Sequence, residues 1–165
     1  MTAALITVAD AIVAELNAAS AAGTFNRTFS ATVLWAQRRI KLEETDVLRV
    51  DVAPIGYAKE LVSRGSWSDT CRYDIGVRKR FVGSDQDSAG EIIDDEITEL
   101  ITLLDQLVGF FMPKQPSQDG RRLAAVPDAV WSPDREQTDV RITWDDLVQY
   151  RQFTGFFRLT YGFSD

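Results

Sequence analysis

Residues 67–81 read WSDTCRYDIGVRKRF, and this stretch decides the fold. Apolar and polar side chains alternate through it with a period of two, which is the pattern of a β-strand with one buried face and one wet face. The buried face is expected to carry Cys71, Tyr73, Ile75 and Val77. Strands in globular proteins typically have about five or six residues, so this one is long. We therefore expect part of it to project as a hairpin arm.

Further strands are expected on both sides of this stretch. Residues 47–52 alternate apolar and charged, and we expect that strand to end at Pro54 and Gly56, because proline cannot donate to a β-ladder. Residues 153–163 also alternate and predict a final, central strand. Other strands or short extended pieces are expected at 29–40, 57–62, 129–131 and 139–144.

Two segments carry the apolar spacing of helices. The first is expected to start with Thr7 as its N-cap and to end before Gly23. The second is expected to be capped by Asp87 or Ser88 and to stop at Pro113, and it has the strongest apolar stripe in the chain. This stripe is typical of a helix packed across a sheet.

The order of these elements predicts an α+β fold. We expect one domain over residues 1–165, with an antiparallel or mixed β-sheet and with a long central helix and an N-terminal helix packed on one face. A chain of this length can bury a core without disulfides. Residues 113–130 contain prolines, a glycine and adjacent arginines, which is the composition of an exposed loop.

Composition argues against several kinds of chemistry. The chain has no histidine, which removes the commonest general base and transition-metal ligand. Cys71 is the only cysteine and is expected to be a small buried residue. The two glycine-rich loops that hold nucleotide phosphates are absent from the sequence. We therefore expect no catalytic residue, no cofactor and no metal.

Charge and hydropathy limit the partners. The net charge of −7 opposes binding to nucleic acid, because phosphate contacts need a cationic surface. The apolar start at 3–19 is interrupted by Asp10 and Glu15 and lacks the basic segment of a secretory signal. No membrane association is expected.

An acidic cluster in the second helix offers the one alternative of a different class, a metal-dependent enzyme. Glu91 and Asp95 are four residues apart and could share a cation. The simpler interpretation is that carboxylates in the first turns complement the helix dipole. The cluster consists of Glu91, Asp94, Asp95, Glu96 and Glu99.

Basic residues on the long strand are candidates for contacts between subunits. Arg72, Arg78, Lys79 and Arg80 could bind phosphate, but the acidic chain favours ion pairs across strands or between copies. We predict that the strand and its arm contact a neighbouring copy. The residues predicted to make this contact are Trp67, Arg78 and Arg80.

Five scaffold segments together resemble a family of tailed-bacteriophage proteins. They are ADAIVAELNAA at 9–19, LRVDVAPIG at 48–56, SRGSWSDTCRYDIGVRKRF at 63–81, DEITELITLLDQL at 95–107 and RQFTGFFRLTY at 151–161. The family is that of tail-terminator and head-tail joining proteins of the neck and tail end. None of the segments is a chemical signature, and the resemblance carries over no catalytic residue.

The resemblance implies a virion structural protein, made in the host bacterial cytoplasm, whose copies close into a hexameric ring. Such a ring sits on the head-proximal end of the tail, stops polymerisation of the tail-tube protein and presents a docking face to neck or head-tail adaptor proteins. DNA would pass through the channel without specific binding, which an acidic channel favours. The alternative within the same virion is a head-completion or neck adaptor protein.

Overall fold

The computed structural model describes residues 3–35, 40–64, 66–92, 94–112, 120–131 and 139–164. Within these residues the chain forms three α-helices and a sheet of six strands, and the predicted α+β fold is confirmed. The helices are α1 (Ala4–Ala21), α2 (Asp94–Phe111) and α3 (Trp144–Tyr150), with short 3-10 turns at Leu42–Thr45 and Gly83–Asp85. The strands are β1 (Ser30–Val33), β2 (Arg49–Ser63), β3 (Ser66–Arg80), β4 (Val130–Trp131), β5 (Arg141–Ile142) and β6 (Gln152–Ser164).

The sheet is mixed, and the long strands occupy its middle. Its order is β1-β2-β3-β6-β4, and β5 pairs with the same edge of β6 as β4 does. Strands β1 and β2 are parallel and the other pairs are antiparallel. Strand β3 is paired on both sides along most of its length, with β2 from Ser66 to Arg78 and with β6 from Ser68 to Arg80.

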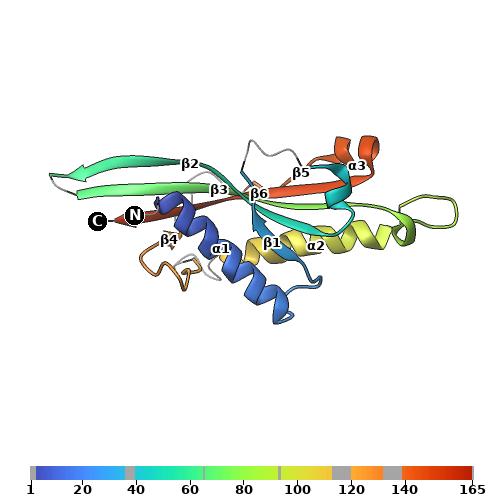
Figure 1. Ribbon diagram of the computed structural model, residues 1–165, viewed down its shortest axis with the longest axis horizontal. Helices are drawn as coiled ribbons and strands as arrows, with labels where there is room; N and C mark the ends of the chain where they lie inside the picture. The colour runs from blue at the N-terminus through green and yellow to red at the C-terminus, as the bar shows by residue number, and fades with distance from the viewer. Residues whose placement is uncertain are drawn as a thin grey trace.

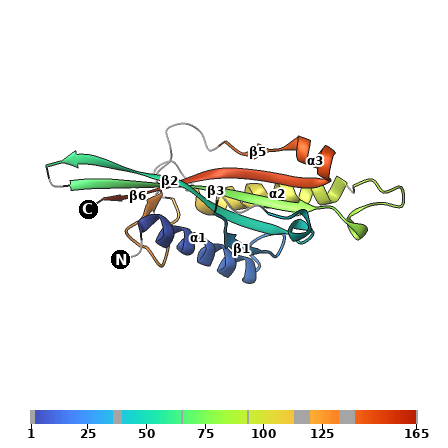
Figure 2. The ribbon, with the colours of Figure 1, turned by 45° about the horizontal axis from the view of Figure 1, so that its top comes forward.

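The alternation in β3 is confirmed residue by residue. Cys71, Tyr73, Ile75 and Val77 are all buried. The β2–β3 hairpin extends past the helices at the left of Figure 1, and the turned view in Figure 2 shows the same projection. The predicted hairpin arm is therefore present.

Strand β2 does not end at Pro54 and Gly56 as the sequence suggested, but continues to Ser63. Strand β1 pairs with β2 only as far as Val52, so beyond this point β2 is an edge strand in the described part of the chain. A proline is tolerated on an edge strand or at a bulge, and the register shifts between Pro54 and Gly56. The missing N–H of proline therefore does not terminate this strand.

Helices α1 and α2 cover the same face of the sheet (Figures 1 and 2). Helix α1 contacts β1, β2 and β3, whereas α2 contacts β6. By length and composition α1 is the one described helix that could cross a membrane, but Val8, Ile12 and Leu16 are fully buried within this fold. A core helix of a folded domain can meet the same criteria of length and apolar composition.

Both predicted helix starts were wrong: α1 begins before its predicted N-cap, and α2 begins after its predicted N-cap. Helix α1 begins at Ala4 with Ala3 as its N-cap, and the hydroxyl of Thr7 donates to the carbonyl of Ala3. Helix α2 begins only at Asp94. The carboxylate of Asp87 instead accepts hydrogen bonds from the backbone N–H groups of Ala89 and Glu91 and so stabilises a separate turn.

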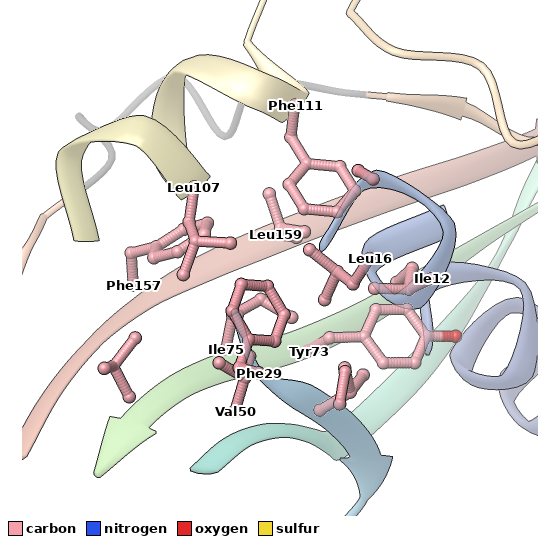
Figure 3. Close-up of a cluster of buried hydrophobic side chains, with 14 of the residues drawn as sticks. Ile12, Leu16, Phe29, Val50, Tyr73, Ile75, Leu107, Phe111, Phe157 and Leu159 are labelled. Carbon is pink, nitrogen blue, oxygen red and sulfur yellow. The ribbon is translucent and has the colours of Figure 1, made fainter. Parts of the chain in front are cut away.

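Figure 3 shows how the core joins the helices to the sheet. Leu107 and Phe111 of α2 lie over Phe157 and Leu159 of β6, and all four are buried. Gly155 of β6 allows this close approach, since a Cβ atom there would lie 2.7 Å from Cδ2 of Leu104. In Figure 3 Ile12 and Leu16 of α1 complete the cluster beside Tyr73 and Ile75 of β3.

The predicted exposed loop at 113–130 is partly exposed and partly buried in the part that the structure describes. Residues 113–119 lie outside the described residues. Within 120–129, Leu123 and Ala129 are fully buried, and the hydroxyl of Tyr161 donates to the carbonyl of Arg121 at 3.0 Å. The apolar residues between the polar ones were enough to fold this segment back onto the core.

An ion pair fixes this segment to α1. Both Nε and Nη2 of Arg121 donate to Oε2 of Glu15, at 3.0 and 2.8 Å, and the backbone N–H of Ala124 donates to Oε1. Burial alone would raise the pKa of Glu15, but the hydrogen bonds from Ala124 and Arg121 hold that pKa below its usual value. The pair therefore stabilises the fold whenever Glu15 is ionised.

Glu15→Gln is expected to lower the free energy of unfolding by about 1 kcal/mol at pH 7, because the charge-assisted bonds to Arg121 are lost. Since the pKa of Glu15 is lowered in the folded state, the wild-type advantage is present above its unfolded value and is lost as pH falls through the folded value. Urea unfolding of both proteins from pH 7 to pH 3 measures this. A difference that stays constant over this range would contradict the assignment.

Candidate functional site

The outer face of the sheet, opposite the helices, carries an ion-paired network around Asp51. This carboxylate is 1% exposed. Its Oδ1 accepts from Nε of Arg49 at 2.5 Å and its Oδ2 accepts from Nη1 of Arg78 at 2.6 Å. The network ties β2 to β3 at the base of the hairpin. Arg78, predicted to contact a neighbour, is thus engaged within its own chain.

The other two predicted contact residues lie at opposite ends of β3. Trp67 pairs with Leu61 near the tip of the arm, whereas Arg80 is the last residue of β3 and lies 3.3 Å from Asp46. Thirteen residues of extended strand separate them by roughly 40 Å. The structure does not bring the three together, and their contact with a neighbour stays a prediction.

Trp67 belongs to an exposed apolar surface on the helix-facing side of the arm, which we call the arm surface. It consists of Trp35, Tyr57, Leu61 and Trp67. Their exposed fractions are 48%, 63%, 58% and 48%. By register, Tyr57 pairs with Cys71, and Leu61 pairs with Trp67, so these side chains continue the face that is buried at Tyr73. The alternation of apolar residues on this face therefore continues beyond the buried core.

A groove of about 680 Å³ lies at the base of the arm surface. Residues 3–7 at the start of α1 form one wall, and Tyr57, Cys71 and Phe163 are among the residues that line it. The hydroxyl of Tyr73 donates to the carbonyl of Leu5 at 2.9 Å and so fixes the start of α1 against β3. The lining is mainly apolar, which suits an apolar side chain of a partner.

Two charged residues, Lys59 and Asp69, also line this groove. Nζ of Lys59 lies 2.9 Å from Oδ2 of Asp69. Oδ1 of Asp69 is buried and accepts no hydrogen bond from the described residues. Such an acceptor is costly to leave unpaired, so the groove favours an occupant that supplies a donor. Cys71 is buried beside it, and burial raises the pKa of its thiol, which agrees with a packing role.

A second exposed apolar surface lies at the opposite end of the molecule, and we call it the α3-end surface. It consists of Leu42, Val148 and Tyr150. Val148 is 82% exposed and Tyr150 is 52% exposed. These residues line a groove of about 540 Å³ together with Arg80 and Arg151. In Figure 1 α3 lies at the right of the molecule and the arm tip at the left.

Sequence reasoning missed α3 altogether. The helix has only seven residues and none of them is buried, so no apolar stripe marks it. It ends at Arg151, which adopts a positive φ of 51° and turns the chain into β6. The apolar residues of the run Leu147–Tyr150 are the one sequence signal for this surface: Leu147 packs against the core, and Val148 and Tyr150 are exposed.

Two of the acidic residues of α2, Glu96 and Glu99, are paired with cations of the chain. Nε of Arg27 lies 2.5 Å from Glu99 and its Nη2 lies 2.9 Å from Glu96. Lys79 also approaches Glu96, at 3.4 Å. In the described part of the chain, no group of three or more His, Cys, Asp or Glu is placed to hold a metal ion. The predicted dipole role remains the interpretation of Asp94 and Asp95.

No protein-family model matches this chain, and the search of curated proteins finds no match either. The two apolar surfaces and the strand that joins them are the structural features that bear on function.

The Asp51 network predicts a clear difference between two carboxylates on the outer face. Asp51→Asn is expected to lower the free energy of unfolding by about 3 kcal/mol, because two arginines lose a buried partner. Asp74→Asn is the matched control. Asp74 pairs with Arg158 at a more exposed position, so its loss is expected to cost below about 1 kcal/mol. Equal losses in thermal unfolding would contradict the importance of the Asp51 network.

Proposed function

We propose that this protein is a structural component of a tailed-phage virion that assembles into a ring at the head-proximal end of the tail, stops growth of the tail tube and joins the tail to the neck. The observation that carries the proposal is the arm surface. Large apolar side chains that a folded chain leaves exposed close together mark interaction sites. On this face Leu61 and Trp67 pair near the tip and Tyr57 lies nearer the base, with the Lys59–Asp69 ion pair between them. Tyr57, Leu61 and Trp67 lie on the paired strands of the hairpin and not on a loop, whereas Trp35 lies beyond the end of β1.

The arm also has a free edge that suits assembly. From Ala53 to Ser63, no described strand pairs with the outer side of β2. Exposed edges are sites where another chain can add main-chain hydrogen bonds. An arm with both an apolar face and an open edge is suited to lie against a neighbouring subunit.

Ring closure explains how such a protein would stop a polymer. A contact between two different patches, repeated by rotation, closes into a ring, and the two faces of that ring are not equivalent. One face can match the tail tube while the other presents a different surface to the neck. The net charge of −7 on each copy favours a channel that DNA passes without adhering.

Light scattering on the purified protein, alone and mixed with isolated tail tubes, tests the proposal. We expect either a ring of six copies in solution, at six times the monomer mass of 18.5 kDa, or a monomer that forms a ring only on tubes. A protein that ignores tail tubes and binds portal-filled heads would contradict the terminator role and favour the neck adaptor. A monomer that binds neither would contradict both.

A further inference from the structure

The two apolar surfaces differ in kind. The arm surface borders a groove whose buried acceptor, Oδ1 of Asp69, lacks a donor among the described residues. The α3-end surface presents Val148 with most of its side chain in water, and it is flanked by the cations Arg80 and Arg151. One surface offers an apolar recess with an unsatisfied carboxylate oxygen, and the other offers a projecting apolar side chain beside guanidinium groups. They are complementary in chemistry, since the guanidinium groups of one can donate to the carboxylate oxygen of the other.

Their positions prevent the two surfaces from meeting within one molecule. They lie at opposite ends of β3, as both views of the ribbon show (Figures 1 and 2). The base of the hairpin is held by the Asp51 network, so the arm cannot fold back onto the α3 end. Contact between them requires a second copy.

The exposed apolar area of the arm surface is large enough to form the centre of a protein–protein interface. An aromatic side chain covers about 150–250 Å², so three aromatics of the arm surface that are about half exposed leave roughly 300 Å² of apolar area in water. Leu61 and the groove walls add to this. A standard interface buries about 800 Å² per partner, including a polar rim, and its centre is the apolar part.

We propose that the α3-end surface of one copy packs into the groove and onto the arm surface of the next copy, head to tail. In this contact Val148 and Tyr150 of one copy cover Tyr57 and Leu61 of its neighbour, and a guanidinium of the α3 end supplies the donor for Asp69. This inference rests on the proposed ring and specifies which surfaces close it. It also gives Trp67 and Arg80 a place on the two sides of one contact.

Directed cross-linking tests the pairing. Two single variants, Leu61→Cys and Val148→Cys, are made in a Cys71→Ala background, whose own assembly is measured first because Cys71 lines the groove. They are treated with a short bis-maleimide under conditions in which this background assembles. We expect little covalent dimer from either variant alone, strong dimer formation from their equimolar mixture, and a ladder of products from the double variant. Val140→Cys, an exposed apolar position outside both surfaces, is the matched control and is expected to yield no dimer with Leu61→Cys.

The outcomes separate this inference from the proposed function. Efficient dimers from Leu61→Cys alone would show an arm-to-arm contact and overturn the head-to-tail pairing. A wild type that assembles while the mixture gives no dimer would also overturn it and leave the ring intact. A wild type that never assembles, alone or on tail tubes, would contradict the ring itself.

A charge placed in the contact provides a second measurement. Val148→Asp is expected to raise the dissociation constant between copies at least tenfold, because a carboxylate would be buried in an apolar recess beside Asp69. Its thermal unfolding should match that of the wild type, since Val148 is 82% exposed in the monomer. Unchanged association of a folded Val148→Asp protein would overturn the assignment of the α3 end.

Discussion

The sheet of this protein is longer than the helices that cover it, and the rest of the structure depends on this mismatch. A strand of 15 residues spans roughly 50 Å, whereas a helix of 18 residues spans about 27 Å. The apolar alternation of β3 continues past Tyr73, where the hydroxyl bond to Leu5 marks the start of α1. Beyond this point Leu61 and Trp67 are about half exposed, and Tyr57, at the edge of the groove beside the start of α1, is 63% exposed. Helices α1 and α2 therefore cover the apolar face of the sheet over the core but not at the end of the arm.

Strand β3 gives this uncovered face a fixed position. Its inner side is packed into the core, and its outer side is tied to β2 through Arg78 and Asp51. Because β6 pairs with β3 from one end to the other, the two ends of β3 are rigidly connected. A contact at the arm is therefore held in a defined orientation to a contact at the α3 end. A fixed angle between two contact surfaces is what a closed ring requires and what an open, flexible chain would lack.

The sequence predicted the parts of the fold in which one period dominates. Strands β3 and β6 and the apolar stripe of α2 follow from alternation and helical spacing alone. The predictions failed where tertiary context overrides a local signal. A proline ends a strand in the middle of a sheet, but Pro54 lies on an edge strand, which continues past it. Asp87 was predicted to cap a helix, but it caps a separate turn. For the site, Trp67 was singled out and is exposed, whereas Tyr57 and Val148 were not singled out; the contact of Trp67 and Arg80 with a neighbour stays a prediction. Exposure depends on which helix lies above a residue, and a single strand pattern does not contain that information.

We expect the uncovered face of the arm to become buried when the protein assembles. Hydroxyl-radical footprinting, read by mass spectrometry on the free monomer and on the assembled protein, measures it most directly. We predict strong protection of Tyr57, Leu61 and Trp67 on the arm together with Val148 and Tyr150 at the α3 end. The labelling of Ile101, an exposed residue of α2, is expected to be unchanged. Full labelling of Tyr57 and Trp67 in an assembled particle would contradict it.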